Sequence, residues 1–174
     1  MKFKNKALFL DRDGVINKNV GYVSSMKNFI WLKNVKNAIK YAYNKKYLII
    51  VVTNQSGVAR GFYTENDVKK LHKEINKQLR KINCEIHDFF YCPYHPKYGS
   101  KKYKKDSFLR KPNPGMLLKA IKKWNIDKSK SLMIGDEKTD MIASKKAGLK
   151  FIRKRYNLMR EVKKKLNIHN FSTK

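Results

Sequence analysis

The sequence predicts a doubly wound, Rossmann-like α/β fold: a parallel sheet of about five strands with helices on both faces. Short apolar runs of strand length alternate along the chain with longer segments whose apolar residues recur at helical spacing. The run 47–52 (Tyr-Leu-Ile-Ile-Val-Val) is continuous and largely β-branched, which is typical of a strand buried on both faces. Polar or acidic residues follow several of the apolar runs directly. We therefore expect a single domain over residues 1–174, with no large cap domain.

The composition fits one globular domain with an unusual charge. The chain has 174 residues, of which 41% are hydrophobic, enough for one well-buried core. It carries 42 Lys and Arg against 13 Asp and Glu, a formal net charge of +29. Such a charge attracts nucleic acids, anionic membranes or phosphorylated metabolites. Because the lysines are spread along the chain without a basic block or a nucleic-acid motif, we expect no nucleic-acid partner.

Cysteine content and the N-terminus indicate where the protein works. Cys84 and Cys92 are the two cysteines, too few for a disulfide framework, which fits a reducing compartment. The apolar run that follows the basic N-terminus lasts only four residues before Asp11, too short to be exported or to span a bilayer. We expect a monomeric cytoplasmic protein that does not contact membranes.

The first half of the chain predicts two strands and two helices. Residues 7–10 form a short buried run, and the apolar positions from Val35 to Ala42 lie on one face of an amphipathic helix. The continuous run 47–52 predicts a second buried strand. Thr64, with an acid three residues later, marks a helix start, and apolar residues at helical spacing carry this helix to Ile82.

The second half continues the alternation. Residues 86–91 predict a third strand, and a loop rich in Lys, Tyr and Gly then runs to Phe108. Asn113 is the expected N-cap of the next helix, with Pro114 at its first position, and this helix continues to Trp124. The remaining expected elements are a strand at 131–135, a short helix ended by Gly148, an edge strand at 150–152, and a lysine-rich helix within the C-terminal segment 156–174.

Two carboxylates stand directly after the first strand. Asp11 and Asp13 differ by two positions, so on an extended backbone they point to the same side. Two negative charges at such a short separation need a compensating cation, and carboxylate oxygens are suitable ligands for a hard ion such as Mg²⁺. The alternative is a surface Asp-Gly turn.

Three further segments favour a ligand site over a surface turn. Residues 53–57 (Thr-Asn-Gln-Ser-Gly) follow the second strand with donors suited to a phosphate, although a plain strand-to-helix turn is also common. Arg110 and Lys111 precede a helix N-terminus, where cations are disfavoured unless an anion binds. Asp136 and Asp140 again follow a strand. Because ligands bind at the carboxyl ends of parallel strands, we expect these segments to converge.

In order and spacing, these residues resemble the four motifs of the haloacid dehalogenase superfamily of phosphatases. The resemblance extends from Ala7 to Ile152. Five segments resemble the branch that contains histidinol-phosphate phosphatases and D-glycero-D-manno-heptose 1,7-bisphosphate phosphatases. They are Asp-Arg-Asp-Gly-Val-Ile-Asn (11–17), Thr-Asn-Gln-Ser-Gly-Val-Ala-Arg-Gly (53–61), Cys-Pro-Tyr-His-Pro (92–96), Arg-Lys-Pro-Asn-Pro-Gly-Met (110–116) and Gly-Asp-Glu-Lys-Thr-Asp (135–140).

This resemblance implies a Mg²⁺-dependent phosphomonoester hydrolase that acts on a small sugar phosphate through an aspartyl-phosphate. It implies that Asp11 is the nucleophile and Asp13 the general acid and base. The carboxylates of Asp11 and Asp136 and the backbone carbonyl of Asp13 would hold Mg²⁺, with Asp140 orienting them. Three other residues are implied to be catalytic: Thr53 and Lys111, which would hold the phosphoryl group, and Arg110. The implied substrate contacts are Arg12, Asn17, Asn19, Val20, Gly21, Tyr22, Asn54, Gln55, Ser56 and Arg60.

The loop after the third strand departs from the family pattern. Zinc-binding members carry Cys-x-His and Cys-x-Cys, whereas the matching positions here are Cys92, Tyr94, Ser107 and Leu109. His95 could replace one of the missing ligands. Since a structural zinc site needs four, we predict that no zinc is bound. We expect aromatic side chains to hold the loop instead, namely those of Tyr91, Tyr94, Tyr98, Tyr103 and Phe108.

A second departure concerns the substrate. Glu137 stands where the heptose-bisphosphate phosphatases often have a Lys that can touch the substrate. We favour a heptose bisphosphate, an intermediate of lipopolysaccharide core synthesis, because Arg60, Arg110 and Lys138 are placed to meet a second phosphate. The alternatives are histidinol phosphate, whose amine Glu137 could meet, and a phosphorylated polynucleotide end.

Overall fold

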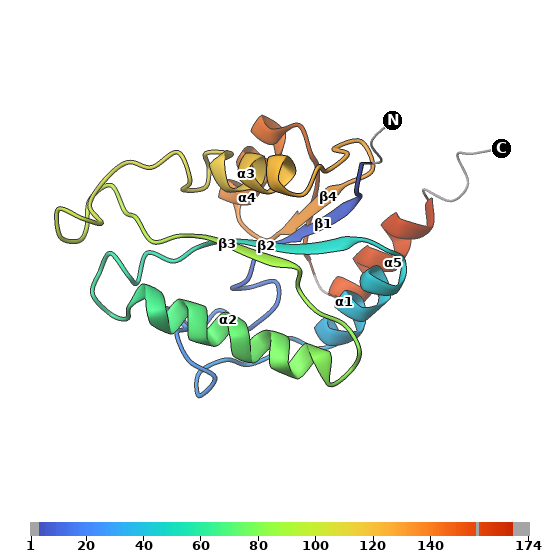
Figure 1. Ribbon diagram of the computed structural model, residues 1–174, viewed down its shortest axis with the longest axis horizontal. Helices are drawn as coiled ribbons and strands as arrows, with labels where there is room; N and C mark the ends of the chain where they lie inside the picture. The colour runs from blue at the N-terminus through green and yellow to red at the C-terminus, as the bar shows by residue number, and fades with distance from the viewer. Residues whose placement is uncertain (1–3, 156, 169–174) are drawn as a thin grey trace.

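The computed structural model describes residues 4–155 and 157–168, and within them strands and helices alternate along the chain (Figure 1). The expected C-terminal segment 156–174 therefore lies partly outside the described residues. The strands are β1 (Ala7–Leu10), β2 (Leu48–Asn54), β3 (Asp88–Cys92), β4 (Leu132–Gly135) and β5 (Lys150–Arg153). The helices are α1 (Val35–Asn44), α2 (Glu65–Arg80), α3 (Gly115–Lys123), α4 (Lys138–Ala147) and α5 (Leu158–Ile168).

All five strands form one parallel sheet in the order β3-β2-β1-β4-β5. β1 lies in the centre, and its last residue, Leu10, is in register with Val51 of β2 and Ile134 of β4. The chain continues this pairing one residue further, since the Asp11 amide donates to the Ile134 carbonyl at 3.1 Å. The carboxyl ends of the three central strands therefore lie at one edge of the sheet, as predicted.

The helices cover both faces of the sheet, as the buried strands require. Figure 1 shows α3 and α4 on one side of the sheet, with α1, α2 and α5 on the other. Leu8 and Leu10 of β1 pack with α1, α2 and α5, while Phe9 packs with α3 and α4. This alternation explains why β1 is apolar and buried at every position. The predicted doubly wound α/β fold is confirmed.

The connection from β1 to α1 spans residues 11–34 and contains no helix or strand longer than an isolated bridge. It is a loop over the carboxyl end of the sheet and not a cap domain. None of the helices within residues 4–155 and 157–168 combines the length and the apolar character needed to cross a membrane.

Element boundaries differ from the prediction at a few places. β3 begins at Asp88 and not at Ile86, because His87 is held beside β2 through Ile49: the His87 amide donates to the Ile49 carbonyl at 2.8 Å, and Nδ1 accepts from the Ile49 amide at 3.0 Å. Pro114, not Asn113, is the N-cap of α3. The Asn113 side chain instead donates to the Ser107 carbonyl at 3.3 Å.

Helix ends follow the local signals. The predicted start of α2 is confirmed as a capping box, in which Thr64 accepts from the Asp67 amide and the Asp67 side chain accepts from the Thr64 amide. α2 ends at Arg80 and not at Ile82, because the chain turns at Asn83 with φ of 57°. Gly148 caps α4 in the left-handed conformation, with φ of 75°, as predicted.

Candidate active site

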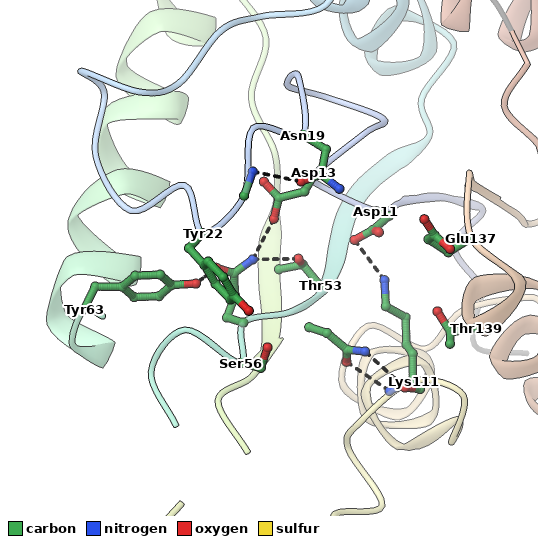
Figure 2. Close-up of a pocket in the computed structure, with 13 residues that line it drawn as sticks. Asp11, Asp13, Asn19, Tyr22, Thr53, Ser56, Tyr63, Lys111, Glu137 and Thr139 are labelled. Atoms are coloured by element: carbon green, nitrogen blue, oxygen red, sulfur yellow. Dashed lines mark hydrogen bonds and ion pairs between the residues drawn. The ribbon is translucent and has the colours of Figure 1, made fainter. Parts of the chain in front are cut away.

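A cavity of about 350 Å³ opens where β1, β2 and β4 end (Figure 2). It gathers residues from the loop after β1, from the end of β2 and the loop that follows it, from the segment before α3 and from the start of α4. The lining residues are Asp11, Asp13, Asn19, Gly21, Tyr22, Thr53, Asn54, Gln55, Ser56, Tyr63, Lys111, Glu137 and Thr139.

Three carboxylates form an acidic cluster beside this cavity. One oxygen from each of Asp11, Asp136 and Asp140 lies within 4.8 Å of the others. Burial raises the pKa of Asp11 from 3.8 to about 7; Lys111 opposes this rise and Asp140 adds to it. Burial, and then the charge of Asp140, also raise the pKa of Asp136. A group of carboxylates placed so close is stable in the charged form only beside a cation.

Lys111 supplies one positive charge to the cluster. Its Nζ lies 2.8 Å from Asp11 Oδ1, 2.6 Å from Asp140 Oδ1 and 3.0 Å from the Val52 carbonyl, so its three donor positions are taken. Although burial alone would lower the pKa of Lys111, the charges of Asp11 and Asp140 raise it above 10.5. The Asn54 side chain pairs with the Lys111 backbone through two hydrogen bonds of 3.0 Å.

The acidic cluster fits a divalent cation. Asp136 Oδ1 is buried and finds no hydrogen-bond partner among the described residues, which leaves it available as a ligand. The donor set is carboxylate oxygen, which suits a hard ion such as Mg²⁺. Gly14, with φ of 82°, lies against Asp136, and a side chain there would overlap the Asp136 carboxylate. The glycine of the Asp-x-Asp-Gly segment therefore makes room for an acid that lies 122 residues later in the sequence.

Asp13 is held by donors from two loops. Arg12 Nη2 lies 3.1 Å from Oδ1 and 2.9 Å from Oδ2 of Asp13, and Asn17 donates to Oδ1 at 2.9 Å. Gln55, from the loop after β2, donates to Oδ2 at 3.0 Å. The Arg12 guanidinium also donates to the Val23 carbonyl at 2.7 Å and has no exposed surface. This network fixes the direction of the carboxylate.

Most of the expected substrate contacts line the cavity, but four do not. Arg12 and Asn17 are buried behind Asp13, so they support that carboxylate from outside the cavity. Val20 is 48% exposed and does not line the cavity. Arg60 lies over the Tyr98 ring, with 3.8 Å between Cζ and the ring centroid.

Arg110, expected among the catalytic residues, also lies outside the lining. Its Nη1 donates to the Tyr94 carbonyl at 3.2 Å, and burial is the main cause that lowers its pKa. Asp136 and Asp140 stand beside the lining as parts of the acidic cluster.

Sequence reasoning missed two lining residues, Tyr63 and Thr139, and treated Glu137 only as a departure from the family pattern. Thr139 and Glu137 lie between Asp136 and Asp140, so their position in that motif was an available signal. Tyr63 precedes the N-cap of α2 and reaches the cavity because the loop after β2 folds back. No pattern in the sequence indicates that reach.

Polar contacts help to hold the loop after β3, where the zinc-binding relatives carry their ligands. Glu65, at the start of α2, accepts from Tyr91 Oη at 2.8 Å and from Tyr103 Oη at 3.0 Å. Of the other aromatic residues expected to hold the loop, Tyr94 is in contact with Tyr103 at 6.2 Å between ring centroids, whereas Phe108 is 62% exposed. Tyrosine hydroxyls bound to one half-buried acid thus do part of what ring packing was expected to do.

Comparison with known proteins agrees with this geometry. The family model described as polynucleotide kinase 3 phosphatase matches residues 7–168. The D-glycero-alpha-D-manno-heptose-1,7-bisphosphate 7-phosphatase of Burkholderia mallei is 42% identical over 146 residues, which cover 84% of this chain and 77% of that protein. The D-glycero-beta-D-manno-heptose-1,7-bisphosphate 7-phosphatase of Haemophilus influenzae is 40% identical, covering 80% of this chain and 75% of that protein.

A solved structure shares the architecture. It is the D,D-heptose 1,7-bisphosphate phosphatase from B. bronchiseptica, complexed with magnesium and phosphate. The TM-score is 0.79 at 26% sequence identity, covering 91% of this chain and 86% of that one. The fold, the acidic cluster at the end of β1 and the identity to these relatives agree, and the chain belongs to the haloacid dehalogenase superfamily of phosphatases, in the branch that contains the heptose-bisphosphate phosphatases.

Proposed function

We propose that this phosphatase removes the 7-phosphate of D-glycero-D-manno-heptose 1,7-bisphosphate. The observation that carries the proposal is the acidic cluster of Asp11, Asp136 and Asp140 beside the cavity, with Lys111 paired to Asp11 and Asp140. It occurs in a chain about 40% identical to proteins named for this reaction. The relatives include enzymes named for the alpha anomer and for the beta anomer, so both anomers are candidate substrates.

Asp11 is proposed to attack the phosphorus in line, forming an aspartyl-phosphate while the bond to the sugar oxygen breaks. Asp13 gives its proton to the departing alcohol. In the second step a water molecule attacks the same phosphorus and Asp13 takes the proton from that water, which restores Asp11 and releases inorganic phosphate. Both carboxylates line one cavity, as this division of roles requires.

Thr53 and Lys111 are proposed to stabilise the charge that develops on the phosphoryl oxygens. Thr53 offers its hydroxyl at the cavity wall. Lys111 acts mainly through its charge, since its three donor positions are already used within the protein.

The carboxylates of Asp11 and Asp136, with the backbone carbonyl of Asp13, are proposed to hold Mg²⁺. When bound, Mg²⁺ would neutralise charge on the phosphoryl oxygens. Asp140 keeps the cluster in place: its Oδ1 binds Lys111 at 2.6 Å, and its Oδ2 accepts from the Glu137 amide at 3.1 Å.

The rest of the substrate is proposed to meet the cavity-lining parts of the loops at 17–22 and 54–60. Arg60, Arg110 and Lys138 do not line the cavity, so they are proposed to attract the second phosphate through their charge. Glu137 supports the competing assignment, because it lines the cavity and its carboxylate could meet the amine of histidinol phosphate. A substrate comparison separates the two.

The test is inorganic phosphate release at equal Mg²⁺ from both anomers of the heptose bisphosphate, histidinol phosphate and a 3′-phosphorylated oligonucleotide. We expect the highest kcat/KM with the heptose bisphosphate, and a loss with Arg110→Ala that is larger for this substrate than for histidinol phosphate. Asp11→Asn should be inactive with unchanged circular dichroism. A higher kcat/KM with histidinol phosphate or the oligonucleotide would reverse the assignment.

The monomeric state, the cytoplasmic location and the absence of zinc remain predictions. Gel filtration with light scattering tests the first of these, and elemental analysis tests the last.

A further inference from the structure

Tyr63 belongs to a hydrogen-bonded chain that ends on two of the reacting groups. Its hydroxyl lies 2.8 Å from Gln55 Oε1, and Gln55 Nε2 lies 3.0 Å from Asp13 Oδ2 and 2.9 Å from Thr53 Oγ1 (Figure 2). Gln55 is 1% exposed, so water has little access to satisfy its amide. Each hydrogen bond in the chain therefore depends on the next.

The chemistry of the partners fixes the direction of this chain. A carboxylate only accepts, so Gln55 must turn its NH₂ group toward Asp13, and the second hydrogen of that group goes to Thr53. The carbonyl oxygen then faces Tyr63, which must donate. Burial raises the pKa of Tyr63 to about 12, which keeps this hydroxyl protonated at neutral pH.

The same direction orients Thr53. Because Oγ1 accepts the amide hydrogen of Gln55, the proton of the Thr53 hydroxyl is free to point elsewhere. The cavity is the side from which a phosphoryl oxygen would arrive. Gln55 thus links the proposed acid and base to the proposed phosphoryl ligand.

The position of Tyr63 is itself built into the loop. A Cβ at Gly57 would overlap the Tyr63 ring, so glycine lets the ring reach Gln55. The Gln55 backbone is fixed from the other side, where its amide donates to the Cys92 carbonyl at 2.8 Å. These contacts fix where the side-chain amide of Gln55 lies, and the acceptor oxygens of Asp13 fix which end of it faces them.

We propose that Tyr63 is a positioning residue: by holding the Gln55 carbonyl, it keeps the Gln55 amide hydrogens on Asp13 and Thr53. This inference rests on the proposed phosphatase mechanism. It also changes the expected role of Gln55, whose amide is engaged within the protein and supports the reaction without binding the substrate. Without the Tyr63 hydroxyl, Gln55 Oε1 is left unpaired and the amide loses one of its restraints, so its hydrogens are held less firmly on Asp13 and Thr53.

The test compares kcat/KM for two leaving groups. A sugar alcohol needs the proton of Asp13 when it departs, whereas p-nitrophenolate leaves without one. We expect Tyr63→Phe to lower kcat/KM for the sugar phosphate about tenfold more than for p-nitrophenyl phosphate. Tyr91→Phe is the matched control, because it removes a tyrosine hydroxyl bonded to Glu65, outside the cavity, and should change neither value.

Gln55→Leu should give the same dependence on the leaving group, and the double variant should be no worse than Gln55→Leu alone, because both changes break one chain. Equal losses on the two substrates, no loss, or additive losses in the double variant would overturn the role of Tyr63. Failure of the proposed function would differ, because the wild-type protein would then prefer another phosphomonoester. In that case the preferred phosphomonoester of an alcohol replaces the sugar phosphate in the leaving-group comparison. The same outcomes then support or overturn the role of Tyr63.

Discussion

His72 should make the stability of the protein depend on pH. It lies on α2, is 5% exposed and stacks on Phe89 with 4.1 Å between ring centroids and 13° between planes. Its Nε2 finds no hydrogen-bond partner among the described residues. Burial, and then the charge of Arg12, lower the pKa of His72 from 6.5 to about 3. The perturbation that tests this is His72→Phe, which keeps a ring on Phe89 and removes the titration.

The sign and size follow from linkage. Between pH 3 and 6.5 the unfolded chain binds a proton at His72 that the folded protein does not, so stability falls as the pH drops through this window. A pKa of about 3 against 6.5 corresponds to a loss of about 2 kcal/mol at pH 5 and about 4 kcal/mol at pH 3. His72→Phe should be spared this loss.

The assay is urea unfolding of the wild type and His72→Phe at pH 7 and at pH 5. The difference in unfolding free energy between the two proteins should shift by about 2 kcal/mol toward the variant on going to pH 5. The other titrating groups are the same in both proteins, so their contributions cancel in the difference between the two unfolding free energies. If the difference is the same at both pH values, His72 is not neutral and buried as described.

Three other predictions concern the loop and the acidic cluster. The purified protein should contain no stoichiometric zinc by elemental analysis; one zinc per chain, lost on Cys92→Ser, would contradict this. Glu65→Ala removes the acceptor shared by Tyr91 and Tyr103 and should lower the unfolding free energy by about 2 kcal/mol in urea, whereas an unchanged midpoint would mean that other contacts hold the loop. Lys111→Met leaves the buried carboxylates without their partner and should cost about 3 kcal/mol with EDTA present; a smaller loss on adding Mg²⁺ is expected, and no loss in EDTA would refute the pairing.

The parts of the site set by strand periodicity could be predicted from the sequence. Asp11 and Asp136 each follow an apolar run, and parallel pairing of β1 with β4 places such residues side by side. The same argument predicted that Thr53 lies at the carboxyl edge of the sheet. These positions depend on the regular geometry of a sheet, which short patterns reveal.

Contacts made by loops could not be predicted in the same way. Arg12 was expected to meet the substrate, yet its guanidinium is fully buried against Asp13 and the Val23 carbonyl. The reach of Tyr63 to Gln55, and of Glu65 to two tyrosines, depends on how irregular segments fold back. Pairings of this kind are fixed by tertiary packing and leave no periodic signal in the chain.

The acidic cluster imposes an order on the events at the site. Asp11, Asp136 and Asp140 hold more negative charge than Lys111 can balance, so a phosphate dianion is repelled until a divalent cation has bound. Because the pKa of Asp11 is raised to about 7, the cation must also displace a proton from part of the molecules near neutral pH. Cation uptake should therefore release protons and weaken as the pH falls below 7. At acidic pH, turnover would then stop because the divalent cation no longer binds, a step that precedes substrate binding.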